Sequence, residues 1–223
     1  MRRATGQDLL TWAETLAGIA RTGLGFTESL YERERYEEVI KVAAEIRTTV
    51  HGDVDVEVVA AEWMRSVGSG VPGYVTPKVA IGAVVGNAAG EILLVQRADS
   101  GVWLYPTGWA DIGYSPSEVA VKEVHEETGI HCEPVSLISV VDGMRQGFTQ
   151  IPLYSLVFHC RAIGGELQAH PLETSDVGWF ARDALPEPLA GMERWLEGAF
   201  AAIDGRSDGV TFDAPRSMPW EDD

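Results

Sequence analysis

The chain contains few of the residues that cross-link a fold or carry it through a membrane. Its two cysteines, Cys132 and Cys160, match no metal-binding spacing, so we expect buried apolar side chains and no disulfide. No segment approaches the roughly 20 apolar residues that span a bilayer. The first residues include two arginines but no apolar stretch of signal-peptide length. These absences predict a cytoplasmic protein without a membrane partner.

Positive charge is also scarce. The 17 Lys and Arg residues face 34 Asp and Glu residues, which leaves a formal net charge of −17. A protein that binds a nucleic-acid duplex needs a basic stripe to replace counterions, and because the sequence has no such cluster we expect no duplex partner. An acidic protein that handles anionic phosphates would instead need a cation as a bridge, with its own carboxylates as ligands. For most of the acidic surface, solubility is a sufficient explanation.

The residues that are present suffice for a folded protein. With 45% hydrophobic and 23% charged residues over 223 positions, the chain suits one ordinary domain and one smaller one. Residues 1–75 predict a small all-α domain of three helices, because apolar residues recur there at helical spacing and Gly23 offers a stop for the first helix. Its apolar stripes must be buried and carry no chemistry, so we expect a homodimer through these helices.

The pattern changes after residue 75. Apolar runs at 79–85 and 92–96 flank a turn and predict a hairpin, and further strands are expected at 137–141 and 153–160. A last helix is predicted at 188–202. Strands interleaved with helices are typical of an α/β fold with a mixed sheet covered on both faces. Residues 204–223 lack periodicity and predict a flexible acidic tail, which leaves 76–203 as the second domain.

One helix, between Ser115 and Gly129, has clear end signals. Ser115, followed by Pro116 and with Glu118 three residues on, forms a capping box, and Gly129 closes the helix. Between these ends Glu123, Glu126 and Glu127 share one helix face. Three like charges weaken an isolated helix, so the arrangement requires a counter-charge. Mg2+ or Mn2+ would supply it, since both prefer carboxylate oxygens.

The run from residue 108 to residue 130 resembles the signature of the Nudix family. The positions that fall in register with the family pattern of a glycine loop and a glutamate-rich helix are Gly108, Glu123, Val124, Glu126, Glu127, Gly129 and Ile130. Two positions depart from it, because Tyr114 stands where the family has its first glutamate and Lys122 where it has arginine. The resemblance covers roughly residues 77–203 and implies the Nudix α/β/α sandwich.

A second resemblance concerns the N-terminal part. Residues 22–46, followed by 73–85, look like the helical extension of one Nudix subgroup and its junction with the catalytic domain. Members of that subgroup are described as hydrolases of nucleoside diphosphates linked to another moiety, including CDP-choline and ADP-ribose. The resemblance therefore implies a small nucleotide substrate and attack by a metal-activated water on one phosphorus of a diphosphate.

The same resemblance assigns roles to individual residues. Glu126 and Glu127 are expected to be the main metal ligands, with Glu123 as a third ligand or as the general base. In this family the base can also come from a distal loop, where Glu173 and Asp176 are the candidates.

Other residues are expected to contact substrate. Arg97 ends one predicted strand, and Asp142 and Arg145 follow another, so all three are candidates for phosphate or nucleotide contacts. The aromatic side chains of the glycine loop, and His125 on another face of the helix, are expected to pack.

We interpret Tyr114 and Lys122 as one coupled change within the catalytic set. In the family, the glutamate and arginine at these positions are thought to pair and to fix the Gly108 loop against the helix. A tyrosine hydroxyl facing the lysine ammonium would replace that pair and leave no unpaired charge. Lys122 can also pair with Glu126 four residues on, and would then compete with a metal for its carboxylate.

Two other functions stay open. A Nudix-like module that senses a nucleotide without cutting it is favoured by the two departures, although no basic recognition helix marks an output domain. A hydrolase of damaged nucleoside triphosphates would share the fold and the chemistry but have a different pocket, which the sequence does not define.

Overall fold

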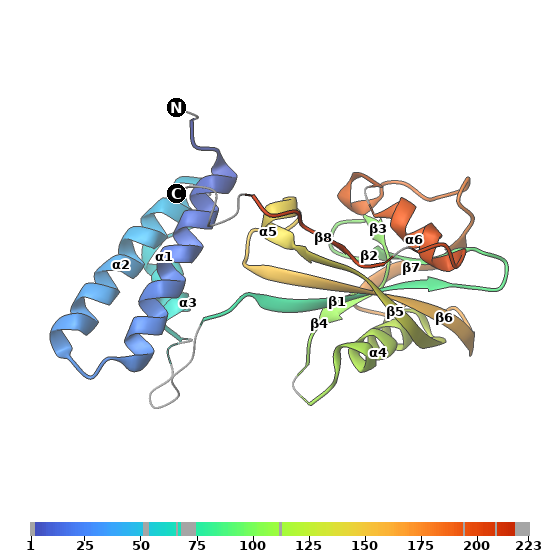
Figure 1. Cartoon of the computed structure of the whole chain (residues 1–223), viewed down its shortest axis with the longest axis horizontal. Helices are drawn as coiled ribbons and strands as arrows, with labels where there is room; N and C mark the ends of the chain where they lie inside the picture. The colour runs from blue at the N-terminus through green and yellow to red at the C-terminus, as the bar shows by residue number, and fades with distance from the viewer. Residues whose placement is uncertain are drawn as a thin grey trace. The chain divides into compact units, whose positions relative to one another are not determined.

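The computed structural model describes residues 3–50, 54–65, 67, 75–111, 113–193, 195–207 and 209–216 (Figure 1). The chain divides into two compact units, one of Met1–Pro77 with Gly143–Leu153 and one of Lys78–Asp142 with Tyr154–Asp223. In the described ranges, no helix is both long and apolar enough to cross a membrane.

The first unit contains the three expected N-terminal helices, α1 (Gly6–Phe26), α2 (Leu30–Val50) and α3 (Val56–Arg65), together with the short helix α5 (Gly143–Gln146). Small alanines let α1 and α2 approach closely, and their shared core is formed by Ala13, Ala17, Ala20, Leu24, Ile40, Ala43, Ala44, Val59 and Trp63. The small all-α N-terminal region is therefore confirmed.

Gly23 does not end α1, and that part of the sequence prediction is wrong. The helix continues to Phe26, and the backbone N–H of Thr27 then bonds the Gly23 carbonyl at 2.9 Å. A Cβ at position 23 would overlap the ring of Tyr36 on α2. The glycine is therefore explained by close packing between helices, since it leaves room for an aromatic ring.

An acidic side chain is buried among these helices. Glu14 is 7% exposed and pairs with Arg47 of α2. Burial raises the pKa of Glu14 above its ordinary 4.5, while Arg47 and Arg21 act in the opposite direction. Both guanidinium groups also lie about 6 Å from the ring centre of Trp63, at 5.8 and 6.0 Å. The ion pair thus links α1 and α2, and the two guanidinium groups extend the contact to Trp63 of α3.

The second unit is built on one mixed sheet. Its strands are β1 (Lys78–Gly86), β2 (Ile92–Arg97), β3 (Trp103–Leu104), β4 (Thr107–Trp109), β5 (Ile130–Asp142), β6 (Leu153–Gly165), β7 (Thr174–Phe180) and β8 (Thr211–Phe212). The main order is β3-β2-β1-β6-β5-β8, with β4 paired to β1 and β7 to β2. The β5–β8 pair is parallel, whereas β5 and β6 are antiparallel.

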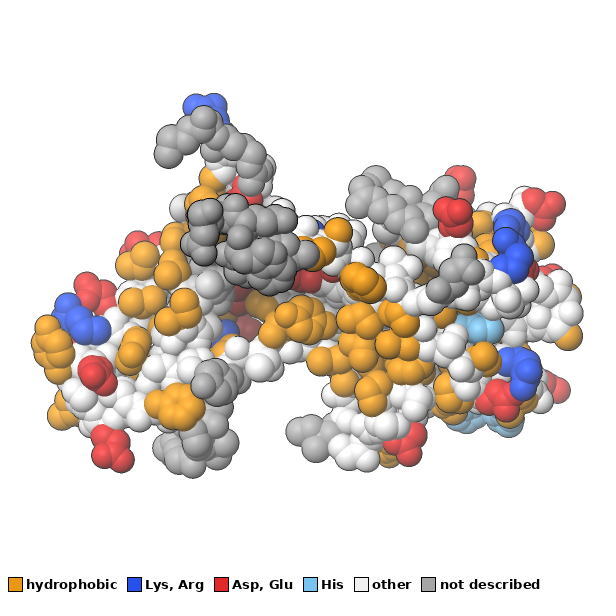
Figure 2. All heavy atoms as spheres, viewed as in Figure 1, with side chains coloured by type: hydrophobic (Ala, Val, Ile, Leu, Met, Phe, Trp, Pro, Cys, Tyr) orange, Lys and Arg blue, Asp and Glu red, His pale blue; other side chains and the backbone are white. Residues whose placement is uncertain are grey.

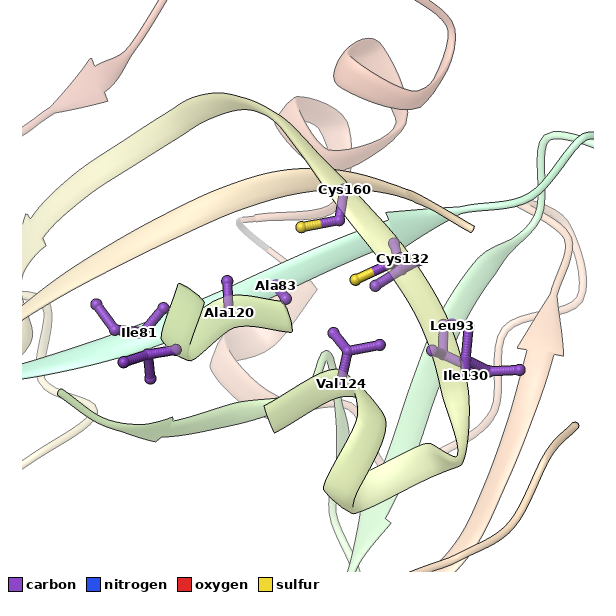
Figure 3. Packing of buried hydrophobic residues seen from close by; sticks show 10 residues of the cluster. Ile81, Ala83, Leu93, Ala120, Val124, Ile130, Cys132 and Cys160 are labelled. Carbon is purple, nitrogen blue, oxygen red and sulfur yellow. The ribbon is translucent and has the colours of Figure 1, made fainter. Parts of the chain in front are cut away.

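A helix covers each face of this sheet. On one face, Val119, Ala120 and Val124 of α4 (Pro116–Thr128) join a core with Ile81, Ala83, Val85, Leu93, Ile130, Cys132 and Cys160 (Figure 3). On the other, Ala199, Phe200 and Ala202 of α6 (Leu196–Ile203) pack on Val84, Ile92, Leu94, Trp103, Ile138 and Val157. The α/β/α sandwich is confirmed, and both cysteines are free and buried as expected.

The boundaries of several elements differ from the sequence prediction. β5 begins at Ile130, directly after α4, so it is much longer than the expected 137–141. The helix expected at 188–202 is instead a 3-10 turn, Ala190–Glu193, followed by α6, because Gly191 has a φ of +69° that an α-helix does not allow. In the segment expected to be a tail, Thr211 and Phe212 pair with β5, a contact that sequence periodicity does not reveal.

Gly23→Ala is expected to destabilise the N-terminal unit, because the new methyl group forces the Tyr36 ring out of its place between α1 and α2. The matched control is Gly18→Ala in the same helix, where a Cβ meets nothing within 4 Å. Overpacking costs about 1 to 3 kcal/mol, whereas alanine in an open helical position gains up to about 1 kcal/mol. Urea unfolding of both variants measures the difference, and equal stabilities would contradict the packing explanation.

Glu14→Gln is expected to change the pH dependence of stability. Because the folded-state pKa of Glu14 is raised above 4.5, its carboxyl stabilises the fold fully below pH 4.5 and loses that contribution as the pH rises through the folded-state value. The free energy of unfolding of the variant, relative to wild type, should therefore rise as the pH increases from 4.5 through the folded-state pKa of Glu14. Urea titrations at several pH values measure it, with the exposed Glu45→Gln as control. A difference that stays constant with pH would count against a raised pKa.

Candidate active site

The site is organised by the start of α4 and the strand before it. Ser115 caps the helix, since its side chain accepts a hydrogen bond from the Glu118 N–H, and the Glu118 carboxylate accepts one from the Ser115 N–H at 2.6 Å. Gly129 ends the helix with a φ of +73°. The predicted capping box and stop are therefore confirmed. The capping box and the glycine end together fix which face of α4 lies toward β4 and toward the loop that follows β4.

Glu127 is the most deeply placed of the three glutamates. It is 7% exposed, and its carboxylate accepts a hydrogen bond from the backbone N–H of Thr107 on β4 at 3.1 Å. Burial raises the pKa of Glu127 to about 8, and the negative charges of Glu123 and Glu173 act in the same direction. Arg97 and the Thr107 N–H oppose the shift. Glu127 is thus a buried carboxylate without a full counter-charge.

Glu123 lies beside Glu127 and packs against β4, the strand that contains Gly108. Only 13% of its side chain is exposed, and a Cβ at Gly108 would overlap its carboxylate. The pKa of Glu123 is raised, first by burial and further by Glu126 and Glu173, while Lys122 lowers it. Gly108 is therefore needed because β4 packs its backbone directly on a carboxylate.

Lys122 bridges the helix and the loop before it. Its ammonium is 2.9 Å from the Glu126 carboxylate, 3.3 Å from that of Asp111 and 3.6 Å from that of Glu123. These carboxylates raise the pKa of Lys122. The expected pair with Glu126 is confirmed.

Tyr114 is not the partner of Lys122, so the predicted coupling of these two residues is wrong. Tyr114 is 54% exposed, and its backbone N–H bonds the Asp111 carbonyl at 3.3 Å. Among the described side chains, those that Lys122 pairs with are Asp111, Glu123 and Glu126. The loop turns so that its acid at position 111 reaches the lysine, which residue spacing alone could not indicate.

Glu173 and Arg97 are brought to the same site by strand pairing. Arg97 ends β2 opposite Thr174 of β7, and the Ala98 N–H bonds the Glu173 carbonyl at 2.9 Å. The charges of both side chains act on Glu127. The Arg97 guanidinium also holds the Asp99 carboxylate through two hydrogen bonds of 2.6 and 3.0 Å, which lowers the pKa of Asp99. Asp99 thus orients the arginine, a role that was missed in the sequence.

Other predicted residues lie elsewhere. Asp142 is the last residue of β5, at the opposite end of that strand from its junction with α4. Its backbone N–H bonds the Asp213 carboxylate at 2.7 Å, and its contact with substrate stays a prediction. Arg145 lies on α5, in the other unit. Asp176 caps the neighbouring N–H of Val177 at 2.8 Å, so Glu173 is the better placed of the two distal acids.

The aromatic residues of the glycine loop mainly pack. Trp103 is 7% exposed and meets Phe180 edge to face at 5.1 Å. Tyr105 makes the same type of contact with Trp195 at 4.9 Å, and burial raises the pKa of its hydroxyl to about 12. Trp109, by contrast, is 51% exposed beside Lys78. The first two rings therefore serve the core, while Trp109 is available at the surface near the site.

The donor set fits a hard divalent cation. Carboxylate oxygens of Glu123, Glu126 and Glu127 lie on one face of α4, and two of these groups have raised pKa values because they are buried near each other. No three acidic, histidine or cysteine side chains in the described ranges already converge as a metal site. Glu126 is turned toward Lys122. A cation would therefore have to draw Glu126 away from the lysine to gain all three carboxylates.

Comparison with known proteins agrees with this geometry. The family described as the NUDIX domain matches residues 76–200, and the family described as the UDP-X-like N-terminal oligomerisation domain matches residues 7–62. The Bacillus subtilis (strain 168) protein YjhB, for which ADP-ribose pyrophosphatase activity has been proposed, is 34% identical over 180 residues, which are 80% of this chain and 82% of YjhB.

Two further relatives differ in what their descriptions say they act on. A solved structure of a UDP-X diphosphatase has a TM-score of 0.56 and 29% identity, and covers 94% of this chain and 100% of its own. An 8-oxo-dGDP phosphatase of Mus musculus is 36% identical over 113 residues, which are 48% of this chain and 33% of that protein. With a family match over more than half of its length, the chain belongs to the Nudix family, as a pyrophosphohydrolase with an N-terminal oligomerisation domain of the UDP-X type.

Proposed function

We propose that this enzyme uses Mg2+ or Mn2+ to cleave the diphosphate linkage of a nucleoside diphosphate joined to another moiety, of the ADP-ribose or CDP-choline class. The observation that carries the proposal is the buried pair Glu123 and Glu127, whose raised pKa values reflect carboxylates held together without a sufficient counter-charge. Similarity to a UDP-X diphosphatase over 94% of the chain supports the substrate class.

The residues then divide into three roles. Glu126 and Glu127 would hold the cation, with Glu123 as a third ligand or as the base, and the cation supplies a water of lowered pKa and charge neutralisation at the phosphate. Glu173, whose charge acts on both Glu123 and Glu127, would accept a proton from the attacking water. Arg97, held by Asp99, would contact a phosphate of the substrate.

A second candidate is the hydrolysis of damaged nucleotides. It is favoured by the similarity to the Mus musculus 8-oxo-dGDP phosphatase, although the matched region covers 33% of that protein. Both candidates use the same carboxylates and differ in the pocket. A sensor without catalysis is less well supported, because Lys122 and Tyr114 leave the three glutamates of α4 in place.

Replacing Glu127 or Glu126 by glutamine is expected to remove most of the hydrolysis, since glutamine keeps the size but removes a charge from the metal site. Losing several kcal/mol of charge stabilisation corresponds to about 10²- to 10³-fold in rate. A panel of ADP-ribose, CDP-choline, UDP-sugars and 8-oxo-dGDP with Mg2+ or Mn2+ measures turnover. The control is Glu133→Gln on β5, which pairs with Arg161 at the surface.

The panel distinguishes the candidates. Preference for the linked diphosphates supports the proposal, whereas preference for 8-oxo-dGDP favours the second candidate. Nucleotide binding without turnover would indicate a sensor. Full turnover in both glutamine variants would refute the assignment of these carboxylates.

We further propose that α1 forms the contact between two copies of the chain. Trp12, Ile19 and Phe26 recur at heptad spacing on this helix and are 52%, 60% and 53% exposed. Figure 2 shows several hydrophobic side chains exposed at the surface over α1 and α2. These three residues lie within the range that matches the N-terminal oligomerisation domain. An exposed apolar stripe in such a domain is a suitable surface for self-association.

Ile19→Glu is expected to convert the oligomer to a monomer, because an unpaired charge would be buried at the contact. The matched control is Ile163→Glu on β6, since Ile163 is 63% exposed, close to the 60% of Ile19. Light scattering on the full-length chain measures the mass of each variant. If wild type is a monomer, or if both variants keep the wild-type mass, α1 is not the contact surface.

A further inference from the structure

The ammonium of Lys122 has partners on two different elements. On its own helix it bonds Glu126, four residues on, at 2.9 Å. Across the gap to the loop that follows β4, it lies 3.3 Å from the Asp111 carboxylate. Asp111 is 49% exposed and Lys122 is 30% exposed, so both side chains are partly shielded from water, which would otherwise weaken the pair. The lysine is therefore shared between the loop and the helix.

This sharing affects Glu126 directly. In the proposed mechanism Glu126 has to bind a cation, yet here its carboxylate is held by Lys122. If the lysine had no other partner, moving Glu126 to the cation would leave an ammonium beside the cation, at a like-charge cost. Asp111 offers a second carboxylate within reach, so Lys122 stays paired when Glu126 turns away.

We propose that Asp111 is a positioning residue that draws Lys122 away from Glu126 and thereby makes the Glu126 carboxylate available to the divalent cation; this rests on the proposed metal-dependent function. Relative to the family pattern, the acidic partner of the lysine stands earlier in the loop. Tyr114 occupies the position where the family has its glutamate, and Asp111, three residues earlier, makes the contact.

Several contacts of Asp111 and Lys122 suit this role. Lys122 also approaches Glu123 at 3.6 Å, so its position affects two of the three carboxylates on α4. The Tyr114 N–H bonds the Asp111 carbonyl at 3.3 Å, which turns the loop so that the Asp111 side chain faces α4. Neither feature requires the Tyr114 hydroxyl.

The test measures Mn2+ binding to the full-length chain by electron paramagnetic resonance, without substrate. Asp111→Asn should weaken Mn2+ affinity by about two- to five-fold, the size expected for a partly exposed ion pair. Lys122→Met removes the competitor, so adding Asp111→Asn to that variant should change the affinity no further. Asp111→Glu should restore most of the wild-type affinity, because it keeps the charge.

Two controls separate this role from a general effect of charge or loop structure. Asp183→Asn removes an exposed carboxylate elsewhere and should leave affinity unchanged. Tyr114→Phe should also have no effect, whereas a loss equal to that of Asp111→Asn would assign the role to the tyrosine hydroxyl. In turnover assays, Asp111→Asn should raise the Mn2+ concentration for half-maximal rate while leaving the KM for nucleotide unchanged.

The proposal is overturned if Asp111→Asn binds Mn2+ as tightly as wild type. It is also overturned if Asp111→Asn weakens the affinity of the Lys122→Met variant as much as that of wild type. Failure of the proposed function has a different signature. In that case Mn2+ binds and responds to the variants as described, but no linked diphosphate is cleaved. Absence of Mn2+ binding in wild type would overturn both.

Discussion

The burial of two carboxylates on one face of α4 is the constraint on which the site depends. Glu127 is 7% exposed and its pKa is raised to about 8, and Glu123 beside it is shifted in the same direction. Placing charged groups in this way weakens the fold unless a counter-charge is present. Arg97 opposes the shift only in part, and it is already held by Asp99. A divalent cation is the partner that fits this arrangement.

The surrounding fold maintains the constraint. The capped start of α4 and its glycine end set the rotation of the helix, and its apolar face is anchored by Val119, Ala120 and Val124 in the sheet core. β4 then covers the carboxylates, with Gly108 against Glu123 and the Thr107 N–H on Glu127. β7 brings Glu173 beside them through its pairing with β2. The carboxylate face of α4 therefore depends on three separate parts of the sheet.

The sequence predicts those features that depend on local spacing. Helix caps, the shared face of Glu123, Glu126 and Glu127, and the N-terminal helices follow from periodicity and are present in the structure. Features set by the path of a loop were missed or assigned wrongly. Asp111, and not Tyr114, meets Lys122, and β5 starts directly after α4, earlier than the sequence predicts. By sequence pattern Gly23 predicts a helix end. The structure explains this glycine by the ring of Tyr36, which belongs to another helix and which the local sequence does not reveal.

Thermal unfolding tests most directly whether the fold tolerates its buried carboxylates in order to bind a cation. We expect Mg2+ or Mn2+ to raise the Tm of the wild-type chain relative to the same protein in chelator. Glu127→Gln should abolish most of that increase. It should leave the metal-free protein at neutral pH at least as stable as wild type, because glutamine removes the cost of burying a carboxyl whose pKa rises to about 8 on folding. A metal-independent Tm, or a Glu127→Gln variant that is less stable than wild type in chelator, would contradict this account.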